Sequence, residues 1–122
     1  MKPNILVIDD NESILEAMKF LLKEAGYNVH TLVNGKAYEE KVQKVKPQLI
    51  LLDIQLQGID GRVIATSLKK KKQTHSIPII MMSAYDNVRK STVKAGANDF
   101  IAKPFNIDTV ISKINNLLGR NS

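Results

Sequence analysis

The sequence predicts an α/β fold in which helices cover both faces of a parallel sheet. Three observations support this prediction. Five short apolar runs alternate strictly with five segments of helical periodicity, and no linker, repeat or low-complexity segment interrupts them. The length, 122 residues, suits one domain. The composition is 43% apolar and 25% charged, which is ordinary for a globular protein and excludes the disordered and fibrous classes.

The first predicted unit is a buried strand followed by an amphipathic helix. Residues 4–8 are an apolar run typical of a strand that is covered on both faces. Apolar residues then recur at helical spacing over residues 14–25. Asp10 or Asn11 can cap this helix, and Gly26 can end it.

The next two strands flank a weaker helix. Residues 29–33 are the second predicted strand, and the helix over residues 38–45 must end near Pro47. Residues 49–52 are the most apolar short run of the chain. They predict a central strand that ends on Asp53.

The second half of the chain continues the alternation with three helices and two strands. The predicted helices cover residues 62–71, 86–95 and 107–118. The predicted strands cover residues 77–82 and 99–102. The last helix has the clearest ends, because Asn106 can cap it and Gly119 can terminate it.

The chain carries a net charge of +6, which raises the question of a nucleic acid or an anionic membrane as a partner. Four of these charges lie in the run of residues 69–72, and without them the net charge falls to +2. We expect this run to be a solvated helix end, and we do not expect nucleic-acid binding.

The composition also limits where the protein works. The chain has no cysteine, which excludes disulfides and thiolate metal sites. No apolar stretch approaches the length of a membrane span, and the first apolar run is too short for a signal peptide. We therefore expect a cytoplasmic protein.

Polar side chains stand at the carboxyl ends of four predicted strands. Asp9 and Asp10 follow the first strand, Asp53 ends the third, Ser83 ends the fourth, and Lys103 comes just after the fifth. Taken singly, each has an ordinary structural explanation, such as a helix cap or a solvated loop residue. Together they are informative, because the carboxyl ends of parallel strands share one edge, where ligands bind.

Three carboxylates at one edge repel one another and resist ionisation unless a cation compensates. Carboxylate oxygens suit Mg2+, which commonly binds phosphate oxygens as well. The sequence therefore predicts a magnesium site that is ready for a phosphoryl group. Metal-dependent phosphate hydrolysis is a weaker alternative, because neither His30 nor His75 falls at a strand end as a general acid or base.

The chain resembles the receiver domain of two-component response regulators over nearly its full length. The resemblance rests on several separate motifs, namely Asp9 with Asp10, Asp53 followed by Gly58, Asp60 and Gly61, Ser83 with Ala84, residues 96–100, and Lys103 with Pro104. It implies one receiver domain over residues 1–122, with a flavodoxin-like five-stranded sheet of order 2-1-3-4-5.

The resemblance implies that Asp53 accepts a phosphoryl group from a histidine kinase or a histidine phosphotransfer protein. Asp9, Asp10, Asp53 and the backbone carbonyl of Gln55 would hold Mg2+. Lys103 and Ser83 would contact the phosphoryl group. In this reading the protein is a phosphoacceptor signalling domain and not an enzyme in the ordinary sense.

The resemblance also implies a switch and a means of tuning it. Ser83 and Phe100 would change the surface formed by the fourth helix, the last strand and the last helix, where an unknown downstream protein would bind. Gln55 and Tyr85 would flank the path of the water that removes the phosphoryl group. The Lys103–Pro104 peptide bond would be cis.

Two functions of different classes follow. The first is a stand-alone phosphoacceptor switch, of the chemotaxis or the phosphorelay type, because only three residues follow Gly119 and an output domain has no room. The second is a basic nucleic-acid or membrane binder on the same fold, which the lysine run at residues 69–72 suggests.

Overall fold

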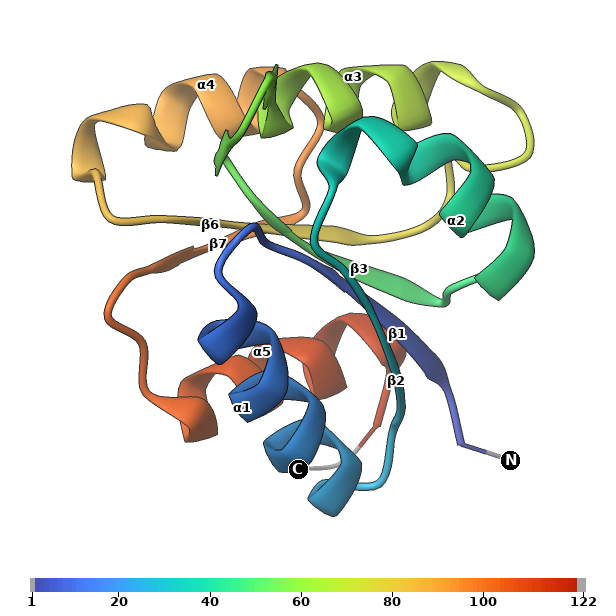
Figure 1. Ribbon diagram of the computed structural model, residues 1–122, viewed down its shortest axis with the longest axis vertical. Coiled ribbons are helices and arrows are strands. Elements are labelled where there is room, and N and C mark those ends of the chain that lie inside the picture. Colours follow the sequence, from blue (N-terminus) through green and yellow to red (C-terminus); the bar gives the residue numbers. More distant parts are fainter. Residues whose placement is uncertain (1, 121–122) are drawn as a thin grey trace.

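The computed structural model describes residues 2–120 and contains a five-stranded parallel sheet between two layers of helices (Figure 1). The order of the strands is β2-β1-β3-β6-β7. This is the expected order 2-1-3-4-5 when only strands of this sheet are counted, so the flavodoxin-like prediction is confirmed. The five strands are β1 (Asn4–Ile8), β2 (Asn28–Leu32), β3 (Leu49–Asp53), β6 (Ile79–Ser83) and β7 (Asp99–Ala102).

The helices divide between the two faces of the sheet. Figure 1 shows α2, α3 and α4 above it and α1 and α5 below it. Within residues 2–120, none of the helices is long and apolar enough to cross a membrane. The five helices are α1 (Glu12–Glu24), α2 (Tyr38–Val45), α3 (Gly61–Lys70), α4 (Arg89–Lys94) and α5 (Ile107–Leu118).

Strand side chains alternate between two cores, one on each face of the sheet. In β1, Leu6 and Ile8 pack towards α2 and α3, whereas Ile5 and Val7 pack towards α1 and α5. The other central strands alternate in the same way, and β1, β3 and β6 are buried almost throughout. This double burial explains why these strands are continuous apolar runs rather than alternating ones.

The expected helix ends are confirmed at α1 and α5. The side chain of Asn11 accepts a hydrogen bond from the backbone N–H of Ile14 (3.1 Å), and that of Asn106 accepts one from Asp108 (2.8 Å). Gly119 ends α5 in the left-handed conformation, with φ of 70°. These caps satisfy backbone donors and acceptors that a helix end leaves free.

Two details of the predicted elements are wrong. The strand expected over residues 77–82 begins at Ile79, because the N–H of Ile77 donates to Thr74 in a turn and Pro78 has no N–H to donate. The helix expected over residues 86–95 is a 3₁₀ turn over Asp86–Val88 followed by the shorter α4.

A small antiparallel hairpin, absent from the predicted elements, follows β3. It consists of β4 (Gln55–Leu56) and β5 (Ile59–Asp60). The hairpin returns the chain to its starting point, where the N–H of Gly61 donates to the carbonyl of Ile54 (2.9 Å). As a result, α3 begins directly against the backbone of Asp53.

The lysine run is less solvated than expected. The ammonium group of Lys69 donates to the carbonyl of Ile77 (2.8 Å) and to the side chain of Asn98 (3.0 Å). Lys71 pairs with Glu39 across the gap to α2 (2.9 Å). Lys69 and Lys71 are therefore engaged by other groups. Of the four lysines in the run, Lys70 and Lys72 are the two that are exposed and have no ion pair with a described residue.

The close approach at Gly61 gives a stability prediction. A Cβ there would overlap the carbonyl oxygen of Asp53 and lie 2.9 Å from the Cα of Ile54, so the backbone would have to move. We expect Gly61→Ala to lower the free energy of unfolding by about 3 kcal/mol in urea denaturation. Gly119→Ala is the matched control, because no atom lies within 4 Å of its added Cβ. Only its positive φ should cost stability there, by about 1 kcal/mol. A loss at Gly61 no larger than at Gly119 would contradict the packing described.

Candidate functional site

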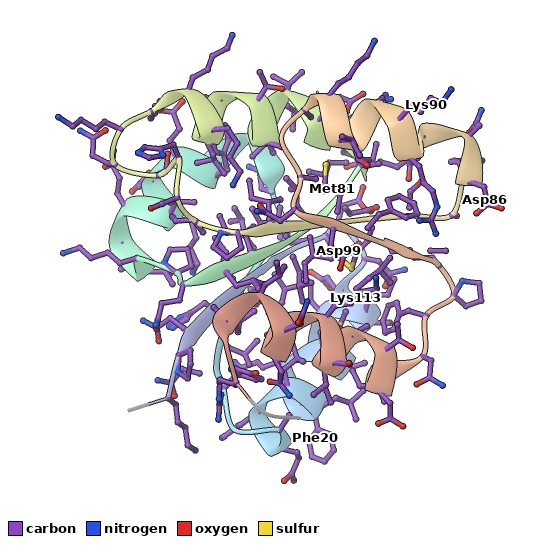
Figure 2. The ribbon with its side chains drawn as sticks, turned by 180° about the vertical axis from the view of Figure 1, so that it is seen from behind. Phe20, Met81, Asp86, Lys90, Asp99 and Lys113 are labelled. Carbon is purple, nitrogen blue, oxygen red and sulfur yellow. The ribbon has the colours of Figure 1, made fainter. Side chains whose placement is uncertain are left out.

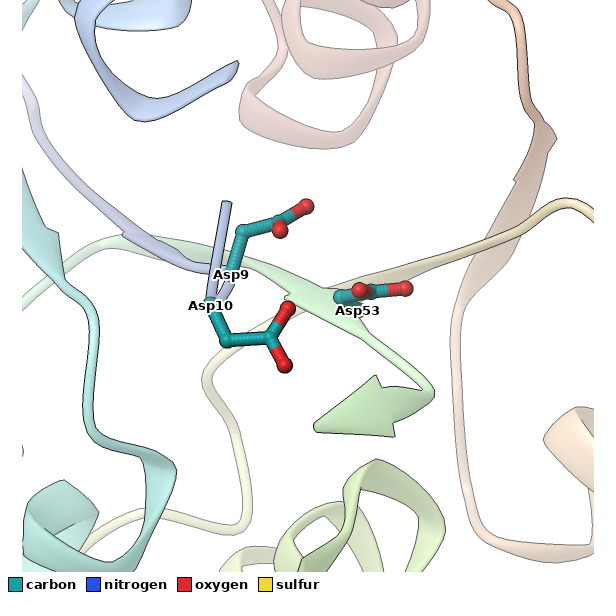
Figure 3. Close-up of side chains that lie close together, drawn as sticks. All are labelled: Asp9, Asp10 and Asp53. Atoms are coloured by element: carbon teal, nitrogen blue, oxygen red, sulfur yellow. The ribbon is translucent and has the colours of Figure 1, made fainter. Parts of the chain in front are cut away.

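The sheet brings Asp9, Asp10 and Asp53 together at one edge, as Figure 3 shows. Each contributes a carboxylate oxygen to a group in which all three oxygens lie within 4.8 Å of one another. Asp9 and Asp10 follow β1, and Asp53 is the last residue of the neighbouring strand β3. The three carboxylates therefore converge as expected.

Asp9 and Asp53 are buried because each continues the alternation of its strand. Val7 and Leu51 pack in the core between the sheet and the helices α1 and α5. Asp9 and Asp53 come two residues later and therefore fall on the same face of the sheet. Asp9 has no exposed surface, and Asp53 is 4% exposed. Asp10 is only partly buried, and its carboxylate reaches the same group.

Lys103 supplies a positive charge to this group. Its ammonium nitrogen lies 2.7 Å from a carboxylate oxygen of Asp9 and 3.4 Å from one of Asp53. Its backbone N–H donates to the carbonyl of Ser83 (2.8 Å), and the Lys103–Pro104 peptide bond is cis, as expected. Three carboxylates and one ammonium leave two negative charges, which is the charge that one divalent cation would neutralise.

One oxygen of the Asp53 carboxylate is left without a partner in the part of the chain that the structure describes. Its Oδ1 is buried and has no hydrogen-bond partner among the described residues. Burial raises the pKa of Asp53 from 3.8 to about 6, and the negative charge of Asp9 adds to this effect, whereas Lys103 opposes it. Keeping Asp53 ionised therefore lowers the stability of the folded protein when no cation is bound.

The residues present fit a divalent cation with oxygen ligands. The Oδ1 of Asp53 is a free acceptor, and Asp10, which is only partly buried, brings a second carboxylate oxygen to the same group. Asp9 is already engaged, because Asn11 donates its backbone N–H to one oxygen (2.9 Å) and Lys103 binds the other. One or two free carboxylates in a cluster of three suit Mg2+, which keeps part of its water shell.

Ser83 lies at the carboxyl end of β6, next to Asp53, and is fully buried. Its hydroxyl donates to the side-chain oxygen of Gln55 (3.1 Å) and accepts from the backbone N–H of Tyr85 (3.0 Å). The pairing of Ser83 with Gln55 could not be foreseen from the sequence. The two residues are 28 positions apart, and the hairpin that presents Gln55 was not predicted.

The other residues considered in the sequence analysis differ in burial and in their distance from the acid cluster. Tyr85 is 59% exposed, so its ring shields the site less than a buried ring would. Phe100 is buried in the core beneath α3 and α4, and the guanidinium of Arg89 lies 4.7 Å from its ring centroid. His30 lies within β2 and His75 in the turn after α3, away from the strand ends that form the site.

One residue at the entrance was missed from the sequence. The side chain of Lys36 lies across Gly58 and, with Asp10, Asn34 and Gln57, lines a hollow beside the acid cluster. Gly58 has φ of 76°, and a Cβ on it would collide with Lys36. Lys36 is a lone lysine in a turn, and nothing in its sequence neighbourhood distinguished it from other exposed lysines.

Comparison with known proteins gives a consistent family. A family model described as the response regulator receiver domain matches residues 5–115. Among curated proteins, the DNA-binding dual master transcriptional regulator RpaA of Synechocystis is 31% identical over 120 residues, which is 97% of this chain and 50% of the relative. The phosphate regulon transcriptional regulatory protein PhoB of Rhizobium meliloti is 30% identical, over 98% of this chain and 54% of the relative. The chain thus spans about half the length of these relatives.

Solved structures with the same fold include a two-component response regulator from Clostridium difficile. It is 26% identical with a TM-score of 0.89, and the match covers 99% of this chain and all of the other. The receiver domain of a sensor histidine kinase from Pseudomonas aeruginosa, which has a magnesium ion in its own active site cleft, is 24% identical with a TM-score of 0.88. That match covers 98% of this chain and 99% of the other.

The raised pKa of Asp53 gives a prediction on stability and pH. The folded state holds this proton up to about pH 6, whereas the unfolded state loses it near pH 3.8, so stability falls as the pH rises between these values. We expect Asp53→Asn to raise the free energy of unfolding by about 2–3 kcal/mol near pH 8 without divalent cations, and by much less near pH 4.

The measurement is urea denaturation at both pH values, with Asp86→Asn as control. Asp86 is an exposed carboxylate, and its replacement should change stability little at either pH. An Asp53→Asn variant that is no more stable than the wild type near pH 8 would mean that the buried carboxylate is satisfied by groups already present.

Proposed function

The chain belongs to the response regulator receiver domain family, and on this premise we propose that Asp53 is its phosphoacceptor. A phosphoacceptor role is general in this family. The observation that carries the assignment to Asp53 is its carboxylate, which is buried at the strand end with one oxygen unpartnered and with Lys103 at 3.4 Å. A carboxylate in this state is a nucleophile whose charge the protein has not neutralised.

The proposed reaction is transfer from a phosphohistidine. A carboxylate oxygen of Asp53 attacks phosphorus, and an O–P bond forms as the N–P bond of the donor breaks. The electron pair of the broken bond returns to the donor imidazole, which then takes a proton from solvent. The product on this chain is an aspartyl phosphate.

We propose Mg2+ as the cofactor, with Asp9, Asp10, Asp53 and the backbone carbonyl of Gln55 as its protein ligands. When bound, Mg2+ would neutralise charge on the phosphoryl oxygens and orient them. The support for this site is the mutual approach of the three carboxylates and the orphan oxygen of Asp53. Asp9 also has a second role in the proposal, because its ion pair holds Lys103 in place.

Lys103 and Ser83 would complete the phosphoryl site. The ammonium group of Lys103 is close enough to Asp53 to move onto a phosphoryl oxygen and stabilise its charge. The hydroxyl of Ser83 is buried beside Asp53 and needs only to turn from Gln55 to donate to the same group. Both residues are therefore catalytic in this proposal.

The same rotation would start the switch. Phosphorylation gives the Ser83 hydroxyl a charged acceptor, which favours it over the neutral amide oxygen of Gln55. Movement of Ser83 and its loop would change the packing of Phe100 and hence the surface of α4, β7 and α5. On this surface Lys113 of α5 reaches Asp99 of β7 (2.9 Å; Figure 2).

We propose a histidine kinase or a histidine phosphotransfer protein as the donor, acting in the cytoplasm, and an unknown protein as the target of the α4-β7-α5 surface. Nucleic-acid binding through the lysine run is not favoured. Lys69 and Lys71 are already held by other side chains and carbonyls, so the run is not a free cationic patch. A single receiver domain over residues 1–122 remains our proposal for the part of the chain considered.

Phosphorylation by a small donor tests the assignment of Asp53. With acetyl phosphate and Mg2+, the intact mass of the wild type should increase by one phosphoryl group, because acetyl phosphate can replace the phosphohistidine. Asp53→Ala should show no increase, and a chelator should abolish the increase in the wild type. An adduct that persists on Asp53→Ala would place the acceptor elsewhere, and no adduct on the wild type would reject the proposal.

The lifetime of the phosphoryl group tests the proposed tuning by Tyr85. The side chain is largely exposed, but the backbone N–H of Tyr85 binds Ser83. We propose from this that the start of the side chain borders the path of an attacking water. We expect Tyr85→Ala to lose radiolabelled phosphate about two- to threefold faster than the wild type, because water reaches phosphorus more easily. Tyr85→Phe keeps the ring and should match the wild type. Equal or slower loss from Tyr85→Ala would show that the ring does not protect the site.

A further inference from the structure

A hollow lined by five lysines lies at an edge of the sheet, away from the acid cluster. Its lining residues come mainly from β2, from α1 and from α2. Figure 1 shows β2 with α1 and α2 on opposite faces of the sheet. The cationic lining of the hollow consists of Lys2, Lys19, Lys23, Lys41 and Lys44, and no acidic residue of the described chain lines it. We call this hollow the β2 groove.

The lysines of the β2 groove are free to bind an anion. None of them takes part in an ion pair within residues 2–120, where the acids that do pair are Asp9, Asp53, Glu39, Asp60 and Asp99. Lys2, Lys19, Lys23 and Lys44 are exposed, and Lys41 is partly buried. Five like charges around one groove repel one another, and an anionic occupant would relieve this repulsion.

The backbone of β2 offers hydrogen bonds within the groove at Val29 and one residue beyond its lining at Thr31. β2 is the end strand of the sheet and pairs only with β1. The N–H of Asn28 and the carbonyl of Leu32 both bond towards the β1 side, to Pro3 and Asp9. Because the backbone groups of successive strand residues point to opposite edges, those of Val29 and Thr31 point outwards.

These outward groups are accessible. Val29 and Thr31 are only partly buried, and no side chain or loop of the described residues bonds to their backbone groups. An edge strand with free N–H and carbonyl groups is a template for an added strand. The β2 groove therefore combines a hydrogen-bonding edge with a positive lining.

We propose that the β2 groove binds an extended acidic peptide segment of a partner protein, which adds to the sheet beside β2. The peptide backbone would bond to Val29 and Thr31, and its carboxylates would meet the lysines of α1 and α2. This surface is separate from Asp53 and from the α4-β7-α5 surface. The inference does not rest on the proposed phosphoacceptor function.

Two other occupants fit the groove less well. A second copy of this chain would bring two sets of five lysines together, and each chain carries a net charge of +6, so the two edges would repel. A single-stranded nucleic acid would match the charge, but Tyr27, the one Phe, Tyr or Trp among the lining residues, is 1% exposed and offers no stacking surface. A peptide uses both the charge and the free backbone.

The test uses fluorescence anisotropy with a labelled peptide in which glutamate and valine alternate. The peptide should bind the full chain, and Lys41→Glu with Lys44→Glu should weaken binding at least about tenfold, because two attractive charges become repulsive. Lys70→Glu with Lys72→Glu is the matched control, since it makes the same charge change at exposed lysines outside the groove. The control should stay within about twofold of the wild type.

Two further measurements separate strand addition from general attraction. Hydrogen exchange at the amides of Val29 and Thr31 should slow when the peptide is bound, and a peptide N-methylated at alternate residues should lose this effect. Oligothymidylate should bind more weakly than the peptide. Should the Lys41 and Lys44 variant not fold, Lys23→Glu alone should still reduce affinity by more than Lys70→Glu alone.

Three results would overturn the proposal. The first is equal weakening by the groove variant and by the control, which would indicate only long-range attraction to a basic protein. The second is binding without slower exchange at Val29 and Thr31. The third is tighter binding of oligothymidylate than of the peptide, which would make the groove a polyanion surface. Phosphorylation by acetyl phosphate should be unchanged in the groove variant, so failure here leaves that function intact.

Discussion

The site depends on one electrostatic imbalance, namely three carboxylates held together with only one ammonium group to offset them. Asp9 and Asp53 are buried by the sheet, and Lys103 reaches both. Burial, with the negative charge of Asp9 beside it, keeps the pKa of Asp53 high, and one oxygen of this buried carboxylate has no partner among the described residues. The folded protein is thus destabilised by repulsion and burial of these carboxylates, and a bound cation would reduce this destabilisation.

The rest of the fold serves to maintain this arrangement. The continuous apolar strands are covered on both faces, so their carboxyl ends cannot separate without opening two cores. The start of α3 presses on the backbone of Asp53, and no side chain fits at Gly61. Lys69, from the other end of the same helix, holds the loop before β6 and the turn before β7. Repulsion among the acids is therefore resisted by packing on several sides.

Much of this could be predicted from the sequence, because strand ends are marked by a change from apolar to acidic residues. Such a change at Asp9 and Asp53, together with the alternation of strands and helices, placed both acids at one edge of a parallel sheet. The hairpin carrying Gln55 was not predicted, because two-residue strands have no periodicity. Lys36 and Lys69 were missed for another reason: a lysine in a turn or in a charge run has the same local pattern whether it is solvated or packed.

The central claim, that Asp53 carries an uncompensated charge awaiting a cation, is tested most directly by titrating its side-chain carboxyl carbon by NMR. Without divalent cations, the account predicts a pKa of about 6. With saturating Mg2+ the pKa should fall well below this value, because the bound cation favours the charged form. An ordinary pKa near 3.8 in both conditions would contradict the account, since it would show that the folded protein already satisfies this carboxylate.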